Sequence, residues 1–172
     1  MTVEDPAVER LRRDAVEHGV DIEFVARGPA RTLEEAAASL DVAPHVIVKT
    51  LVAKARRTQS AKDHSFVIAL IPGDRQVDWA KLRRLTGMKK VSMTAPEEAL
   101  EATGFQPGTI TPFGAAAADG TRWPIFADES IAGRIAMGAG ADGLSLFVDS
   151  AELFAAYDVV VDDITKTPPQ AS

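Results

Sequence analysis

The chain has 172 residues, about the length of one domain, which leaves no room for separate cofactor and substrate domains. It has no cysteine, which excludes thiolate nucleophiles, disulfides and sulfur-ligated zinc, and its three histidines are scattered, so no metal or cofactor is expected. The formal net charge of -6 argues against indiscriminate nucleic-acid binding, which depends on concentrated Lys and Arg.

The N-terminal residues 1–18 mix charges of both signs and lack the apolar stretch of a signal peptide. No run elsewhere is long enough to span a bilayer. We therefore expect no membrane association and a cytoplasmic location. Within this segment, Asp5 as an N-cap and Pro6 in the first turn predict a helix over 6–18.

Helical and strand patterns then alternate along the chain. Strands are predicted at 22–27, 45–55 and 65–72, the last two as neighbours, and helices from Thr32 to about Asp41, over 77–87 and over 94–104. The Pro- and Gly-rich stretch 106–126 predicts loops that join short strands. Closing strands are expected within 124–130, 133–140, 144–150 and 157–163, with a helical turn at 150–156 and a frayed tail over 165–172.

No internal repeat or interdomain linker interrupts these patterns. Strands mixed irregularly with helices predict one α+β domain over 1–172, with a mixed curved sheet or barrel and surrounding helices.

A glycine motif, GAGADG at 138–143, matches the dinucleotide-binding pattern G-x-G-x-x-G. That motif needs a strand before it and a helix after it, whereas here a second predicted strand follows, and Asp142-Gly143 is typical of a hairpin turn. A tight turn, or close approach of a ligand to the backbone at Gly138 and Gly140, explains the glycines better.

Lys49 interrupts the apolar strand VIVKTLV. Strand alternation gives two apolar faces, so we expect this strand to be covered on both sides. The ammonium must then reach water, a carboxylate or a ligand, because burying an unpaired charge is costly. A lysine that snorkels from the end of a strand is the alternative.

The segment GTITPFG at 108–114 has Pro112 and Gly114 as a rigid and a flexible point. It predicts a stiff loop with exposed amides from Gly108 to Pro112, able to face a carbonyl oxygen or to wall off a small pocket. An ordinary connection is equally compatible with these residues.

Two stretches are basic despite the negative net charge. Arg56, Arg57 and Lys62 form one, and Lys81, Arg83, Arg84, Lys89 and Lys90 form the other. They are either solvated helix and loop faces or a patch for a polyanion.

Six segments in this order resemble the YbaK/ProX family of aminoacyl-tRNA deacylases, which includes the editing domain inserted in some prolyl-tRNA synthetases. They are TLEEAAASLDV, VIVKTLVAK, FVIALIPGDRQVDWAKLRRLTG, APEEALEATGFQPGTITPFG, PIFADES and MGAGADGLSLFVDSAEL. The resemblance covers about residues 20–163. It implies an α+β fold around a mixed, barrel-like sheet, and hydrolysis of the ester that joins a wrong amino acid to the 3′ end of tRNA.

The resemblance also implies roles for particular residues. Lys49 matches the family's functional lysine, and Gly138 and Gly140 match a glycine turn beside the pocket. The substrate-gripping loop corresponds to Gly108, Thr109, Ile110, Thr111 and Pro112. The histidine that often follows the glycine turn is missing, as is the acidic residue that the cysteine-specific branch often has near Ser145, so the amino acid stays unnamed.

We therefore expect a deacylase that acts in trans on the acceptor end of mischarged tRNA, without a covalent intermediate. Loop amides would hold the ester or terminal ribose, and Lys49 would anchor the terminal phosphate or polarise nearby groups, while water or a ribose hydroxyl attacks. An aminoacyl-tRNA synthetase is a further partner that the resemblance allows. Two alternatives stay open: a non-catalytic module that binds tRNA or a synthetase, and a small aminoacyl-ester hydrolase that does not use tRNA.

Overall fold

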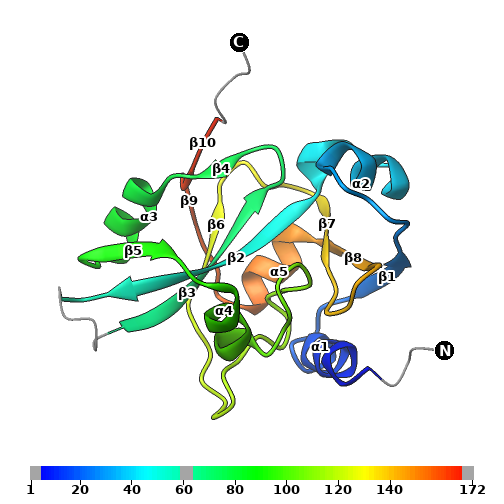
Figure 1. Cartoon of the computed structure of the whole chain (residues 1–172). Coiled ribbons are helices and arrows are strands. Elements are labelled where there is room, and N and C mark those ends of the chain that lie inside the picture. Colours follow the sequence, from blue (N-terminus) through cyan, green and yellow to red (C-terminus); the bar gives the residue numbers. More distant parts are fainter. Residues whose placement is uncertain (1–4, 59–63, 168–172) are drawn as a thin grey trace.

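The computed structural model describes residues 5–58 and 64–167, which form a single α+β domain (Figure 1). The helices are α1 (Pro6–Glu17), α2 (Leu33–Leu40), α3 (Trp79–Thr86), α4 (Pro96–Thr103) and α5 (Ser150–Ala156), with a 3-10 turn, η1 (Pro44–Val46). The strands are β1 (Ile22–Ala26), β2 (Val48–Arg56), β3 (His64–Pro72), β4 (Gln76–Val77), β5 (Lys90–Met93), β6 (Ile125–Asp128), β7 (Arg134–Gly138), β8 (Leu144–Asp149), β9 (Val160–Asp162) and β10 (Thr165–Lys166).

The predicted helix ends are confirmed by cap contacts that the sequence signals. The Asp78 side chain accepts a hydrogen bond from the Lys81 amide at the start of α3, and Thr32 caps α2 in the same way through the Glu35 amide. Gly87 ends α3 in the left-handed conformation, with φ of 72°.

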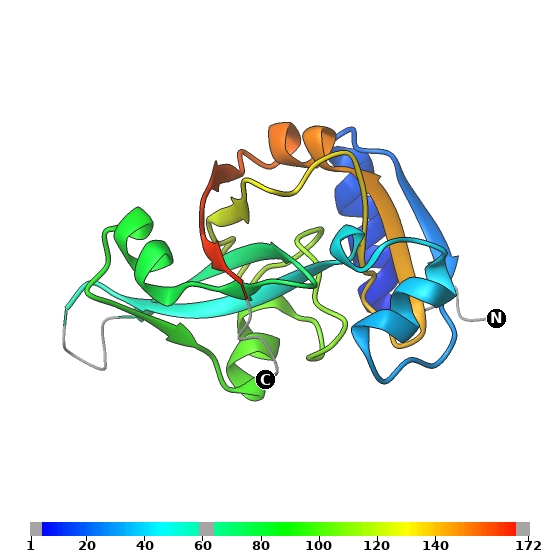
Figure 2. The same ribbon diagram turned by 90° about the horizontal axis from the view of Figure 1, so that it is seen from above.

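The strands form a five-stranded mixed sheet in the order β5-β2-β3-β6-β9, an antiparallel sheet in the order β1-β8-β7, and the pair β10-β4. The predicted pairing of the two long strands is confirmed, since β2 runs antiparallel to β3 from Val48 opposite Pro72 to Arg56 opposite His64. One bridge, Ile47 with Ala136, joins the two larger sheets in the described part of the chain. The sheets are strongly angled to each other and do not close into the barrel that was one form of the prediction (Figure 2).

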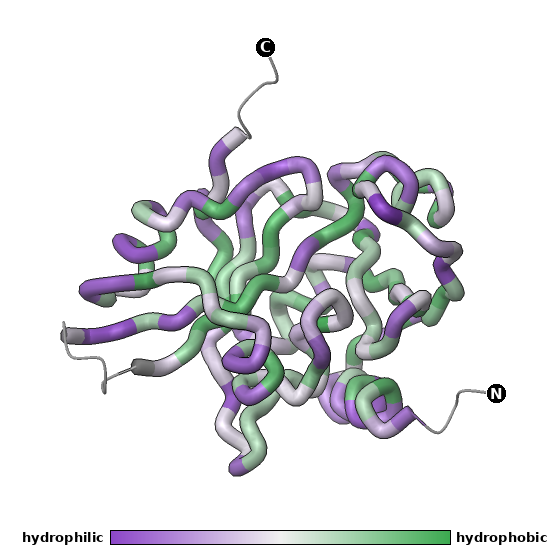
Figure 3. Tube along the Cα trace, in the orientation of Figure 1, coloured by the Kyte–Doolittle hydropathy of each residue, from purple (hydrophilic) through white to green (hydrophobic). Residues whose placement is uncertain are grey.

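The main core lies between these two sheets, where the hydrophobic stretches gather in the interior of the trace (Figure 3). Leu11 of α1, Leu70 of β3, Phe113 and Leu146 of β8 are all fully buried in it. A second cluster packs α3 onto the five-stranded sheet through Leu82, whose side chain is also fully buried. The cores therefore hold the sheets, and the loops between them, in fixed relative positions.

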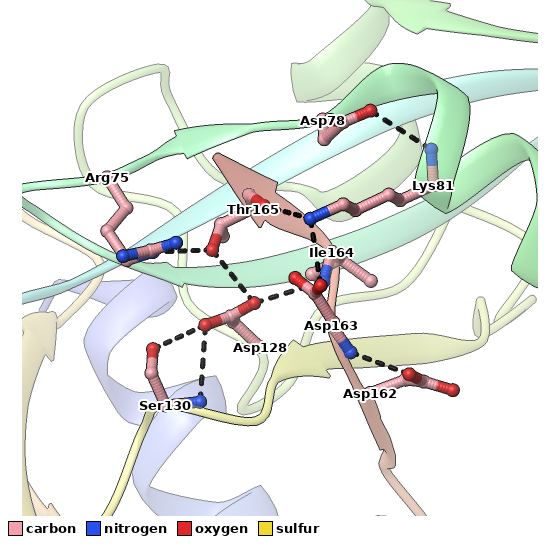
Figure 4. A network of polar contacts seen from close by, with 9 residues as sticks. All are labelled: Arg75, Asp78, Lys81, Asp128, Ser130, Asp162, Asp163, Ile164 and Thr165. Carbon is pink, nitrogen blue, oxygen red and sulfur yellow. Dashed lines mark hydrogen bonds and ion pairs between the residues drawn. The ribbon is translucent and has the colours of Figure 1, made fainter. Parts of the chain in front are cut away.

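The expected frayed tail is corrected in part, because Thr165–Lys166 form β10 against β4. Buried Asp128, at the end of β6, holds this segment: its Oδ1 accepts from the Ile164 amide at 3.0 Å and from the Thr165 hydroxyl at 2.9 Å (Figure 4). Burial alone would raise the pKa of Asp128, but hydrogen bonds from Ser130, Ile164 and Thr165 outweigh it and lower the pKa. Residues 168–172 lie outside the described part of the chain, as does Lys62.

Two cations add to this contact network (Figure 4). The Lys81 ammonium donates to Asp163 at 2.8 Å and to the Thr165 carbonyl at 2.9 Å, and Arg75 donates to the Thr165 hydroxyl at 2.6 Å. Lys81, one of the basic residues noted in the sequence, thus has a structural partner. None of the helices in residues 5–58 and 64–167 has the length and apolar character to cross a membrane.

Candidate functional site

A cavity of about 300 Å³ lies where the two larger sheets meet. Its walls come from α2, the segment that leads into β2, the β7–β8 hairpin and the loop that begins at Gly108. Apolar side chains, such as Leu40, Met137 and Leu144, cover much of the surface. The polar side chains that line it are those of Arg27, Lys49, Thr50 and Ser145, and no carboxylate is among the lining residues.

The cavity brings together predicted site residues that are far apart in the sequence. Lys49 of β2, Gly108 and Ile110 of the loop, and Gly138 of β7 all line it. Thr109, Thr111 and Gly140 are buried behind this lining, and Pro112 faces a different hollow. The lysine and the loop therefore face one space, as the predicted site requires.

Both faces of β2 are covered farther along the strand, where Val52 and Ala53 are buried, but Lys49 near its start is exposed. The reason lies in strand register: β5 pairs with β2 only from Ala53 to Arg56. The beginning of β2 therefore has one edge open toward the cavity. Within the described residues no carboxylate pairs with the Lys49 ammonium, so its charge is free to meet an anion.

The loop presents fewer free amides than its sequence suggests. The Thr109 amide donates to the Gln106 carbonyl at 3.0 Å, and Pro112 has no amide hydrogen. The amides of Gly108 and Ile110 have no hydrogen-bond acceptor among residues 5–58 and 64–167, and both residues line the cavity. These two N–H groups are the donors available to a ligand.

Glycines let the β7–β8 hairpin approach this loop. A Cβ on Gly138 would lie 3.2 Å from the Ile110 carbonyl oxygen and 3.4 Å from two Thr109 backbone atoms. Gly140, with φ of 88°, donates its amide to the Thr109 carbonyl at 3.0 Å. The predicted interpretation of the motif as a close-packed turn agrees with this geometry, and β8 follows it where a dinucleotide site would need a helix.

A family model described as "Aminoacyl-tRNA editing domain" matches residues 27–156, which include the whole cavity. The chain belongs to this family. The editing domain is also similar to two bacterial proline–tRNA ligases. It is 34% identical over 127 residues to that of Heliobacterium modesticaldum and 30% identical over 122 residues to that of Bacillus pumilus. These matches cover 73% and 71% of this chain but 20% of each ligase, so the chain spans a fifth of the length of these relatives.

Two solved structures match nearly the whole of this chain and are themselves of similar length. A crystal structure of a candidate trans-editing enzyme for prolyl tRNA synthetase superposes with a TM-score of 0.78 at 26% identity, covering 94% of this chain and 98% of that one. A hypothetical protein at 24% identity, with a TM-score of 0.77, shows the same fold. The predicted family resemblance and α+β fold are thus confirmed.

The far end of the editing domain's loop is held by Asp14 of α1, which the sequence analysis did not single out. Its carboxylate is almost fully buried and accepts from the Gly114 amide at 2.7 Å, from Arg122 at 2.6 Å and from the Tyr157 hydroxyl at 2.6 Å. Burial by itself would raise the pKa of Asp14, but these three partners outweigh it and lower the pKa. The signal in the sequence was an acid between Leu11 and Ala15 on the apolar face of a predicted helix.

Pro112 lines a separate hollow of about 160 Å³ beside His18, Arg122 and Tyr157. His18 stacks on the Tyr157 ring, with centroids 4.2 Å apart. This hollow adjoins the Asp14 contacts, since Arg122 and Tyr157 both line it, and it shares no lining residue with the cavity. Pro112 therefore belongs to the support of the loop, and its predicted role in gripping substrate stays a prediction.

Three further polar residues of the cavity, Arg27, Thr50 and Ser145, were also not predicted as site residues. Arg27 ends the strand segment IEFVAR, where a terminal arginine looks like an ordinary solvated residue. Within the described residues, no group of three or more His, Asp or Glu side chains is placed to hold a metal ion. The chemistry available in the cavity is thus that of cations, hydroxyls and backbone amides.

Proposed function

We propose that this editing domain is an aminoacyl-tRNA deacylase that hydrolyses mischarged tRNA in trans, in the cytoplasm where tRNA is charged. One observation carries the proposal: Lys49 lines the same small cavity as Gly108 and Ile110, whose amides have no hydrogen-bond acceptor in the described part of the chain. Membership of the editing-domain family supports charged tRNA as the substrate. The match over nearly all of a candidate trans-editing enzyme supports action in trans.

The reaction needs a site for the oxygen that gains negative charge. Water attacks the ester carbon and passes its proton to the neighbouring ribose hydroxyl or to solvent, the bond to the ribose oxygen breaks, and that oxygen takes up a proton. In this scheme the amides of Gly108 and Ile110, two residues that line the cavity, donate to the carbonyl oxygen as its charge grows, or hold the terminal ribose. Donors fixed before the reaction contribute roughly 3–4 kcal/mol each at best.

Lys49 has a different task in this scheme. Its ammonium lies at the exposed edge of the cavity, where the tRNA strand would enter, and suits the terminal phosphate as a compact point charge. Among the described residues, the cavity lining contains no histidine or carboxylate to take a proton from the Thr50 or Ser145 hydroxyl. Since a hydroxyl nucleophile needs such a base, we assign no covalent acyl-enzyme.

A basic edge at the other end of β2 supports a substrate with a long polyanionic body. We define the basic edge as Arg56, Arg57, Arg83, Arg84, Lys89 and Lys90, of which all except half-buried Arg56 are exposed. The Lys89 amide donates to the Arg56 carbonyl at 2.8 Å, and Arg56 pairs with Lys90, so the two basic stretches of the sequence meet here. At about 3.3 Å per residue, Arg56 lies roughly 23 Å along β2 from Lys49, beyond the reach of an aminoacyl nucleotide alone.

Replacing Arg84, Lys89 and Lys90 together with alanine is expected to raise KM for charged tRNA about 10-fold and to weaken the salt dependence of kcat/KM. Each lost phosphate contact removes somewhat less than one unit from the log–log salt slope, so the slope should fall by about 2–3 units. Steady-state kinetics at several salt concentrations measure both effects. Hydrolysis of a short aminoacyl oligonucleotide should be unchanged, as should tRNA kinetics in the control Arg13→Ala. Equal loss on the short and the full-length substrate would contradict the role of the basic edge.

The proposed function is tested by measuring amino-acid release from a panel of correctly and wrongly charged tRNAs, with and without prolyl-tRNA synthetase. We expect turnover of at least one wrongly charged tRNA by the editing domain alone. Binding without turnover would indicate a non-catalytic module. Turnover of simple aminoacyl esters at the same rate as charged tRNA would indicate a small-molecule hydrolase.

A further inference from the structure

Polar atoms in the cavity lack partners that burial would normally demand. The Nε of Arg27 and the Oγ1 of Thr50 are shielded from solvent, and neither has a hydrogen-bond partner in the described part of the chain. Both residues line the cavity, and no lining residue offers a carboxylate to the guanidinium. Since unsatisfied buried polar groups are costly and rare, these atoms indicate a ligand that completes their hydrogen bonds.

Arg27 and Ser145 lie on the same face of the sheet β1-β8-β7. Val25 is opposite Ser145 in the register, and Ser145 is opposite Gly138. Arg27 continues the ladder, since its amide donates to the Gly143 carbonyl at 2.8 Å. Being two residues beyond Val25, it is a diagonal neighbour of Ser145, at a typical separation of roughly 7–8 Å.

Ser145 also lines the cavity, although only 6% of the residue is exposed. A guanidinium and a hydroxyl at this separation can donate to the same small group. A guanidinium offers a planar fork of N–H donors that matches the two oxygens of a carboxylate. The pair therefore resembles a carboxylate subsite in its chemistry.

Lys49 and Arg27 enter the cavity from different strands. The strands follow in the order β1, β8, β7, and the Ile47 bridge to Ala136 places the start of β2 next. Three spacings of about 4.8 Å separate the backbone of Arg27 from that of β2, roughly 14 Å in all. The two cations therefore start from backbones that lie apart, which allows them to meet different parts of one substrate.

We propose that Arg27 and Ser145 bind a carboxylate at the end of the aminoacyl side chain, so that the substrate is tRNA wrongly charged with an acidic amino acid. This inference rests on the proposed deacylase function and names its substrate class. With Lys49 at the terminal phosphate and the ester at the loop amides, the side chain extends toward Arg27. Leu40 and Leu144 line the cavity as apolar contacts for its methylene groups.

The test uses one tRNA transcript charged in turn with glutamate, glutamine, aspartate and asparagine, because each acid and its amide have nearly the same shape. The wild-type chain is expected to hydrolyse the better acidic ester at least 10-fold faster than its amide counterpart, since a polar site discriminates strongly against a ligand that leaves it unpaired. In Arg27→Gln this ratio should fall toward one, and in Ser145→Ala it should fall in part. Arg13→Gln, an exposed arginine outside the cavity, is the matched control and should keep the wild-type ratio.

Other outcomes overturn the inference in distinguishable ways. If Arg27 binds a tRNA phosphate instead, Arg27→Gln slows acid and amide esters by the same factor and their ratio does not change. If the wild-type chain hydrolyses both equally, or prefers the amide, the carboxylate subsite is wrong while the deacylase function stands.

If no ester is hydrolysed, the deacylase function fails, and the subsite is decided by binding alone. Calorimetry would then compare two stable amide analogues, 3′-glutamylamino-3′-deoxyadenosine and 3′-glutaminylamino-3′-deoxyadenosine. A dissociation constant at least 10-fold lower for the glutamyl analogue supports the subsite, and equal constants overturn it.

Discussion

Replacing Lys49 with alanine is expected to slow hydrolysis of charged tRNA about 100-fold, because a charge-assisted contact worth about 2–3 kcal/mol is lost. The free energy of unfolding should change by less than about 0.5 kcal/mol. The Lys49 side chain is exposed, and its removal leaves no hydrogen-bond or ion-pair partner unsatisfied among the described residues. Single-turnover kinetics on the best substrate of the panel measure the first effect, and urea unfolding measures the second.

The control for Lys49 is a lysine of the same strand that does not line the cavity. Lys54 forms an ion pair with Glu98 of α4. Lys54→Ala should therefore leave the hydrolysis rate unchanged and lower the folding stability by no more than about 1 kcal/mol. Lys49→Arg keeps the charge and should retain part of the activity. Full activity of Lys49→Ala on a tRNA that the wild-type chain hydrolyses would contradict the assigned role.

Replacing Asp14 with asparagine is expected to destabilise the fold by about 3 kcal/mol, because breaking a buried ion pair leaves its remaining partners unsatisfied. Both carboxylate oxygens of Asp14 accept hydrogen bonds, so the amide nitrogen of an asparagine would bring one donor against another donor. The Gly114 amide and the Tyr157 hydroxyl, which share Oδ2, and Arg122 then lose an anionic acceptor. Thermal unfolding should show a fall of roughly 2–4 °C for each kcal/mol in a chain of this size. Asp21→Asn, an exposed acid beyond the same helix, should stay within about 0.5 kcal/mol of the wild type.

The Asp14 contacts also predict how stability depends on pH. The pKa of Asp14 is lowered in the folded chain, so the unfolded chain binds a proton more readily than the folded one. The stabilisation is fully present above the ordinary aspartate pKa of about 4 and is lost as the pH falls from there through the lowered pKa. Asp14→Asn should therefore flatten the decline of stability below pH about 4. An unchanged acid limb of the curve would contradict this account.

Local signals in the sequence predicted most of the fold. Cap residues such as Thr32 and Asp78 fix helix starts by contacts within a few residues, and Gly87 ends a helix through its own backbone. Such effects do not depend on the tertiary structure, so they can be recognised without it. The tail was mispredicted because β10 is held by Asp128, a residue distant in sequence whose bonds no local pattern reveals.

The candidate site was predictable only in outline. The apolar neighbours of Lys49 predicted a strand covered on both faces, which holds at Val52 and Ala53, but strand alternation does not show that β5 pairs with β2 only from Ala53 onward while Lys49 is exposed. Of the predicted loop from Gly108 to Pro112, only Gly108 and Ile110 line the cavity, and this division between cavity and support arises from packing that involves Asp14 and Gly140. The sequence around Arg27 gave no sign of a functional role. That role is inferred from the buried Nε of Arg27, which has no hydrogen-bond partner among the described residues.

The bridge from Ile47 to Ala136 makes the cavity a seam between two sheets that share the main core. A small change in the tilt of one sheet against the other would widen or narrow this seam without altering any residue that touches the substrate. Side chains between the sheets, such as Leu70 and Leu146, therefore act as spacers. Relatives with the same lining can in this way diverge in the size of amino acid they accept, through substitutions in the interior alone.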